Sequence, residues 1–177
     1  YRLTAHLALA FLVYGYMLWV ALGLLFAGGA AARRGPHGLA MAVTAMAALT
    51  VMSGGLVAGI DAGFIYNTFP LMDGRLVPDG LFEMEPAAIN AFENATMVQF
   101  NHRVLAIATA LAAVGLWLAS RRNRLEGRAR LAANTMLTVV ILQVALGIAT
   151  LLTVVAVPLA AAHQAGAMVV FTALLWL

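Results

Sequence analysis

The chain has 177 residues, of which 64% are hydrophobic and 10% are charged, and this composition excludes an ordinary water-soluble domain. Cysteine is absent, which excludes disulfides, zinc sites with thiolate ligands and covalent c-type haem attachment. The net charge is +3, yet all ten basic residues are arginines whose placement follows membrane topology, so no nucleic-acid partner is indicated.

Five hydrophobic runs are long enough to cross a membrane as helices, since about 20 residues span ~30 Å of hydrocarbon. The fold class that we predict is an all-α integral membrane protein with five transmembrane helices. In chain order the runs are 3–27, 39–60, 97–119, 131–157 and 159–177.

Arginines are concentrated in the two loops that follow the first and third runs. These loops, around Arg33-Arg34 and from Arg121 to Arg130, hold seven of the ten arginines but only one of the seven acids, Glu126. Cytoplasmic loops carry such an excess, so we place both loops on the inner side of the membrane. The first run then enters from the outer side, and we expect earlier helices in a longer protein.

The first run opens with Arg2 and His6, which share one helical face because they are four residues apart. This pair suits a haem whose iron takes His6 and whose propionate meets Arg2. An arginine that merely anchors the helix at the interface is the alternative. His37, beside the next inner loop, is interpreted as solvated.

The second run and the loop after it supply glycines and acids. Gly55, Gly59 and Gly63 form a small-residue stripe, which we interpret as a helix-packing surface. Residues 61–96 contain six of the seven acids and form a long outer loop. Loops of this length are usually functional, often as lids.

Two histidines lie just inside the outer ends of the third and fifth runs. His102 is five residues beyond Met97 and His163 five beyond Pro158, so each is expected ~7.5 Å below its helix start. These helices run in the same direction. An ionisable group in hydrocarbon costs a few kcal/mol unless something binds it, so both histidines are predicted to face the bundle interior.

We interpret the pair as axial ligands of one haem iron, which two neutral imidazoles satisfy. Zinc needs three or four ligands, and a proton relay needs acids within the spans, where Asp61 at a helix end is the closest. Arg103 is positioned to meet a haem propionate, or else Glu93 or Asp61. Histidines that only hydrogen-bond within the bundle remain the alternative.

An internal repeat supports a third histidine of the same kind. When residues 5–19 are aligned on 162–176, seven of fifteen positions are identical, including His6 with His163 and Trp19 with Trp176. If this repeat is structural, the first helix corresponds to the last. The last four helices then form one complete bundle, and three helices of a preceding bundle are missing.

Four segments carry a resemblance to a known family. They run from Tyr1 to His6, from Gly59 to Met72, from Phe92 to Arg103, and from His163 to Ala167. In sequence and order they resemble haem A synthases, especially those of proteobacteria and mitochondria. The resemblance implies eight transmembrane helices in two pseudo-symmetric bundles. Residues 1–38 would be the last helix of the first bundle plus an inner loop, and 39–177 the second bundle.

The resemblance also implies roles for these residues. His102 and His163 would ligate a haem b cofactor, and His6 would be one ligand of the substrate haem O in the first bundle. The family oxidises the C8 methyl group of haem O to the formyl group of haem A, with water as the oxygen source. The acid assigned to catalysis would lie on the absent helices, so this chain alone should be inactive.

Two other functions stay open from the residues alone. One is a non-catalytic b-type cytochrome that anchors or carries electrons for a larger complex, and the other is a transporter or scaffold without cofactor. Expected partners are lipid, haem O and haem A, with haem O synthase, oxidase assembly proteins or a second copy as further candidates. The expected location is the bacterial inner membrane, or the mitochondrial inner membrane in a eukaryote.

Overall fold

The computed structural model describes residues 1–25 and 36–177, and the regular elements in these ranges are helical. Five helices are long and apolar enough to cross a membrane, which confirms the five predicted spans. They are α1 (Arg2–Leu25), α2 (His37–Gly59), α4 (Ala95–Arg122), α5 (Gly127–Leu152) and α6 (Val157–Trp176). The outer loop holds two 3₁₀ turns, η1 (Ala62–Phe64) and η2 (Ala87–Ile89), and the short α3 (Asn90–Glu93).

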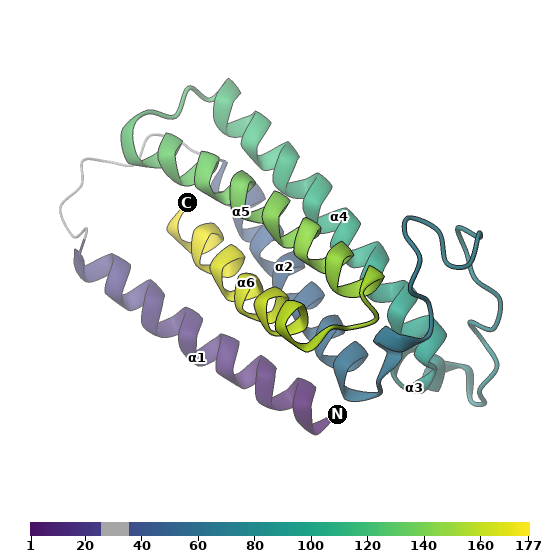
Figure 1. The fold of residues 1–177 in the computed structure, drawn as a ribbon. Coiled ribbons are helices and arrows are strands. Elements are labelled where there is room, and N and C mark those ends of the chain that lie inside the picture. The colour runs from purple at the N-terminus through teal and green to yellow at the C-terminus, as the bar shows by residue number, and fades with distance from the viewer. Residues whose placement is uncertain (26–35) are drawn as a thin grey trace.

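Helices α2, α4, α5 and α6 form a four-helix bundle (Figure 1). Both α2 and α5 pack along α4 and along α6, so α4 and α6 stand diagonally across the bundle from each other. Helix α1 lies outside this bundle against α2 and α6. Helices α1, α4 and α6 run in the same direction, as predicted (Figure 1).

The close-packed apolar core occupies the inner half of the bundle. All four bundle helices contribute to it: Val43, Ala47, Ala113, Leu116, Met136, Val140, Val170, Ala173 and Leu174. On α6 the cluster begins at Val170, seven residues inward of His163. On α2 and α5 it begins at Ala47 and Val140, each seven residues inward of the glycine that contacts a histidine. The inner half therefore holds this apolar cluster, and the two histidines lie outward of it.

Helix α1 docks through a few specific contacts. The rings of Phe11 and Phe171 pack edge to face with centroids 5.4 Å apart, and the Tyr14 and Thr172 hydroxyls are 2.6 Å apart. A methyl group at Gly55 would lie 3.2 Å from Leu7, so this glycine lets α1 approach α2 closely. The predicted packing role is thus confirmed for Gly55.

Two helix ends differ from the predicted spans. Helix α5 ends at Leu152 instead of continuing to 157, because the chain turns through Val154 and Val155, whose φ angles are 54° and 58°. That turn is apolar, so hydropathy alone does not reveal it. Helix α4 continues past Ala119 to Arg122, and the guanidinium of Arg121 lies 5.4 Å from the Trp117 ring. The arginines Arg33 and Arg34 lie outside the described residues.

The outer loop is organised by side-chain amides. Asn90 is fully buried and bonds to both the N–H and the carbonyl of Met84. The Asn94 amide donates to the Gly80 carbonyl at 2.7 Å, while its oxygen accepts from the Met97 N–H and caps α4. The loop is therefore tied to the outer end of the helix that carries His102.

Candidate haem site

His102 and His163 stand at nearly the same depth on the two diagonally opposed helices. His102 is seven residues beyond the first residue of α4, and His163 is six beyond the first residue of α6. At ~1.5 Å per residue these positions are about 10 Å and about 9 Å from the helix starts.

Each imidazole lies against a glycine of a neighbouring helix. A Cβ at Gly54 of α2 would be 3.1 Å from His102 Cε1, and one at Gly147 of α5 would be 2.8 Å from His163 Cε1. Each glycine is five residues before the last residue of its helix. The α2–α4 and α5–α6 hairpins therefore present the same pair of a glycine and a histidine from opposite sides of the bundle.

The residues that contact the two imidazoles are small or polar: Gly54 and Ser53 lie against His102, and Gly147 lies against His163. Large apolar side chains of the described core begin about two helical turns further inward. Cofactors in helix bundles bind in such interior positions between facing helices. His102 and His163 therefore lie outward of the apolar cluster, between helices that face each other in the bundle.

The hydrogen bonds of His102 define its tautomer. Its Nδ1 is 2.8 Å from Ser53 Oγ, and the Ser53 hydroxyl donates to the Thr50 carbonyl at 2.7 Å. Because that hydroxyl has one proton, its oxygen accepts from Nδ1–H of the ring. Nε2 of His102 then carries the lone pair, which is the form that a metal requires.

The surroundings of His163 are different. Its Nδ1 is buried and has no hydrogen-bond partner among the described residues. Gln143 donates from Nε2 to the His163 backbone carbonyl at 2.8 Å, and its Oε1 lies so close to Gly166 that a methyl group there would be 2.2 Å away. Gln143 therefore holds the α6 backbone and leaves the ring without a partner.

Arg103 fastens the outer loop over this end of the bundle. Its two terminal nitrogens donate to the carbonyls of Thr68 and Tyr66, each at 2.8 Å. Gln99, one turn earlier, also donates to the Tyr66 carbonyl, at 3.0 Å. The expected pairing of Arg103 with Glu93 or Asp61 is not what the structure shows, since Glu93 accepts from the Tyr1 hydroxyl. Arg103 Nε is buried without a described partner.

His6 and Arg2 are separate from this site. Both are exposed on α1, whose Thr4 and Leu7 are the residues that contact α2 at Gly55. The structure therefore brings His102 and His163 into one bundle and leaves His6 on another surface. His37 is also exposed, in agreement with its interpretation as solvated.

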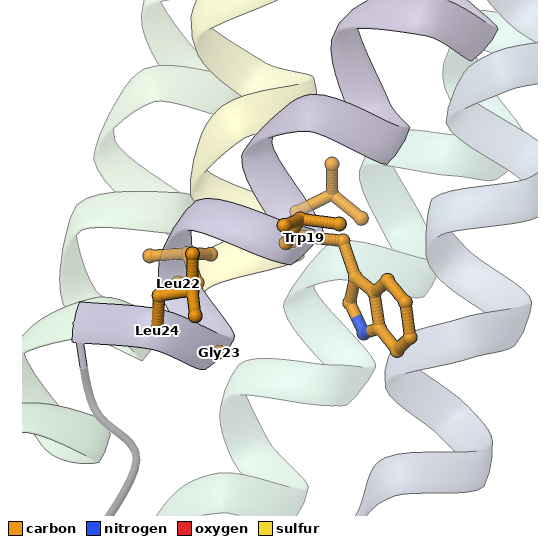
Figure 2. Close-up of a pocket in the computed structure, with 6 residues that line it drawn as sticks. Trp19, Leu22, Gly23 and Leu24 are labelled. Carbon is orange, nitrogen blue, oxygen red and sulfur yellow. The ribbon is translucent and has the colours of Figure 1, made fainter.

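The donor set fits haem better than a bare metal ion. Among the described residues no group of three histidine, cysteine or acidic side chains could hold a metal. Two imidazoles, each lying against a glycine, are the kind and number of ligands that a haem iron would take. An apolar hollow lies elsewhere, toward the inner end of α1, and is lined by Trp19, Val20, Leu22, Gly23, Leu24 and Leu175 (Figure 2).

Two residues of the site were not singled out from the sequence. Gly54 adjoins the predicted glycine stripe, but the stripe followed Gly55, which faces α1. Ser53 is one of three hydroxyl residues in the second span, with Thr44 and Thr50, so its polarity alone did not distinguish it. Neither could be paired with His102 without knowing how α2 faces α4.

Comparison with known proteins identifies the family to which the chain is related. Residues 1–175 match the COX15-CtaA family, described as cytochrome oxidase assembly protein. Similar relatives are the haem A synthase of Nitrosospira multiformis (53% identical over 99% of this chain and 51% of the relative) and that of Rhodospirillum centenum (48%, over 99% and 48%). Human haem A synthase COX15 is 44% identical over 100% of this chain and 44% of its own length.

The chain spans about half the length of the curated relatives that it matches. No solved structure matches it. The relatives are bacterial and mammalian, and with five helices able to span a membrane the chain is a multi-pass membrane protein.

Proposed function

The chain belongs to the COX15-CtaA family of cytochrome oxidase assembly proteins, and from this membership we propose that it carries the cofactor half of a haem A synthase. The observation that carries the proposal is the pair His102 and His163, level with each other on opposed helices, each beside a glycine. The reaction is oxidation of the C8 methyl group of haem O to a formyl group. Water supplies the oxygen, and electrons and protons leave.

In this proposal His102 and His163 are the axial ligands of haem b. When bound, a haem with two histidine ligands supplies one-electron transfer, because its iron has no open position for substrate or oxygen. Ser53 holds His102 in the tautomer that offers Nε2. Arg103 and Gln99 hold the Tyr66–Thr68 segment at the outer end of α4.

His6 and Arg2 have a different proposed role. They are exposed on α1 and share a face, so they are available to helices that this chain does not include. We assign His6 as an iron ligand of the substrate haem O and Arg2 as a propionate contact. Residues 1–38 would then belong to a first bundle and residues 39–177 to a second, and oxidation would need both.

The proposed membrane is the bacterial inner membrane, or the mitochondrial inner membrane in a eukaryote. Arg103 is also proposed as a propionate contact, through the buried Nε that has no described partner. Haem O synthase and oxidase assembly proteins are the proposed partners.

The test is haem analysis in a host that makes haem O but lacks a haem A synthase. The full-length gene should yield a haem with the mass and haemochrome spectrum of a formyl haem, and a variant with His102 and His163 both replaced by alanine should not. Haem O and haem B alone, with the protein present and haem-loaded, would instead favour the non-catalytic b-type cytochrome. Protein without any haem band would favour a scaffold.

A further inference from the structure

The two histidine positions are alike in backbone placement but not in hydrogen bonding. Gly54 and Gly147 occupy equivalent places on α2 and α5. Gly54 contacts the imidazole of His102 on α4, and Gly147 contacts that of His163 on α6. The residue before Gly54 is Ser53, whereas the residue before Gly147 is Leu146. A hydroxyl therefore stands on one side of the pseudo-symmetric site where an apolar side chain stands on the other.

Ser53 is well placed to act on the ring of His102. Its side chain is buried, its oxygen is 2.8 Å from Nδ1, and its proton is committed to the Thr50 carbonyl at 2.7 Å. A hydroxyl that donates to a carbonyl is a stronger acceptor, because hydrogen bonds in a chain polarise one another. The Nδ1–H bond thus places more electron density on the imidazole and fixes its orientation.

Leu146 cannot do the same for His163. Its side chain has no acceptor, and the buried Nδ1 of His163 has no partner among the described residues. Gln143 is the nearest polar candidate, but its Nε2 is bonded to the His163 carbonyl and its Oε1 lies against Gly166. The ring of His163 is held by contact with Gly147 without a bond that would fix it.

We propose that Ser53 is a positioning residue that makes His102 the more electron-donating and more firmly held of the two axial ligands. The inference rests on the proposed haem function of the pair. A more strongly donating imidazole stabilises ferric over ferrous iron, so Ser53 lowers the reduction potential of the bundle haem.

The experiment measures the midpoint potential and the electron paramagnetic resonance spectrum of the bundle haem. This haem is identified as the one that is largely absent from the His102→Ala variant. The variants are Ser53→Ala, Ser53→Thr and, as the mirror change, Leu146→Ser. Ser120→Ala is the matched control. Ser120 is also buried, on α4, and also donates to a backbone carbonyl, that of Leu116, but it lies five turns from His102.

Ser53→Ala should raise the midpoint potential, change the spectrum of the low-spin haem and weaken haem retention by about 10-fold, the size of effect typical for residues that support a metal ligand. Ser53→Thr should restore the wild-type values, and Ser120→Ala should leave them unchanged. Leu146→Ser should shift the potential downward by giving His163 an acceptor.

An unchanged potential in both Ser53→Ala and Leu146→Ser would overturn the inference while leaving the haem site intact. If Ser53→Ala loses its haem altogether, Leu146→Ser decides alone, and an unchanged potential there contradicts the inference. If the wild-type protein has no haem that depends on His102 and His163, the proposed function itself fails, which is a distinguishable result.

Discussion

The outer halves of α1 and α6 carry the same sequence pattern but have different surroundings. His163 of α6 lies inside the bundle against Gly147, whereas His6 of α1 is exposed. The difference comes from the neighbouring helix. Helix α2 presents Gly55 to Thr4 and Leu7 of α1, while the adjacent Gly54, about 100° around the helix, faces His102.

This comparison teaches that a histidine at the right depth is only half of such a site. The other half is a glycine at the same level on a neighbouring helix, which makes room for the imidazole. Because Gly54 and Gly55 are consecutive, α2 makes room for His102 of α4 on one side and lets α1 approach closely on another.

The largest effect is expected from removing a ligand. His102→Ala or His163→Ala should lower the haem content of the protein as purified to a small fraction of the wild-type value, because a single imidazole holds the iron more weakly than the pair does. Haem content per protein, measured as the haemochrome, reports the result.

Replacing the histidines outside the bundle should have the opposite outcome. His6→Ala and His37→Ala should leave the bundle haem in place, since both residues are exposed and belong to other surfaces. Loss of the bundle haem in His6→Ala would contradict the assignment of His6 to a surface separate from the His102 and His163 site.

A smaller but still clear effect is expected at the glycines. A methyl group at Gly147 would lie 2.8 Å from His163 Cε1, and one at Gly54 would lie 3.1 Å from His102 Cε1. Gly147→Ala should therefore lower haem occupancy more than Gly54→Ala does. Both changes displace a ring that has to meet the iron.

Gly115→Ala is the matched control for these variants. Its Cβ would meet nothing within 4 Å, so alanine there should leave haem occupancy unchanged and stabilise the helix by about 0.5–1 kcal/mol. Equal haem occupancy in the Gly147, Gly54 and Gly115 variants would contradict the role given to the two glycines.

The docking of α1 should be weakened slightly by Tyr14→Phe. This change removes the hydrogen bond with Thr172, and such bonds between membrane helices contribute about 0.6 kcal/mol. A small decrease in thermal stability is expected, with no change in bundle haem. Tyr16→Phe is the control, because Tyr16 is 68% exposed, and an equal decrease there would show that the Thr172 contact has no specific effect.

The smallest effect concerns the contact between the start of α1 and the outer loop. The Tyr1 hydroxyl donates to Glu93 Oε1 at 2.5 Å, and this bond raises the pKa of Tyr1 above its ordinary value of 10.0. The contact therefore persists below pH 10 and is lost as the pH rises through the raised pKa. Phenolate absorbance should show Tyr1 ionising at lower pH in Glu93→Gln.

Tyr1→Phe identifies the component of that titration that belongs to Tyr1. If Glu93→Gln leaves this component where it is in the wild type, the bond between α1 and the loop does not form in solution.

Much of the fold followed from hydropathy and charge, because a membrane span must be long and apolar. The five spans, their directions and the matched depth of His102 and His163 could be read in this way. The end of α5 could not, since the turn at Val154 and Val155 is as apolar as the helix.

The partners of the histidines were harder to predict than the histidines themselves. An intramembrane imidazole is conspicuous because it is costly, whereas Gly54, Gly147 and Ser53 are ordinary residues of a packed helix. Their role depends on how α2 and α5 are rotated toward α4 and α6. Rotation is set by many small packing contacts, which no short motif records.

The most direct test of the account is the electron paramagnetic resonance spectrum of the oxidised bundle haem. Two axial histidines predict a low-spin signal in the wild type, a high-spin signal in a haem-reconstituted His163→Gly variant, and a return to low spin when imidazole is added. A high-spin wild type, or a low-spin signal that persists without change in His163→Gly, would contradict the assignment of His102 and His163 as the iron ligands.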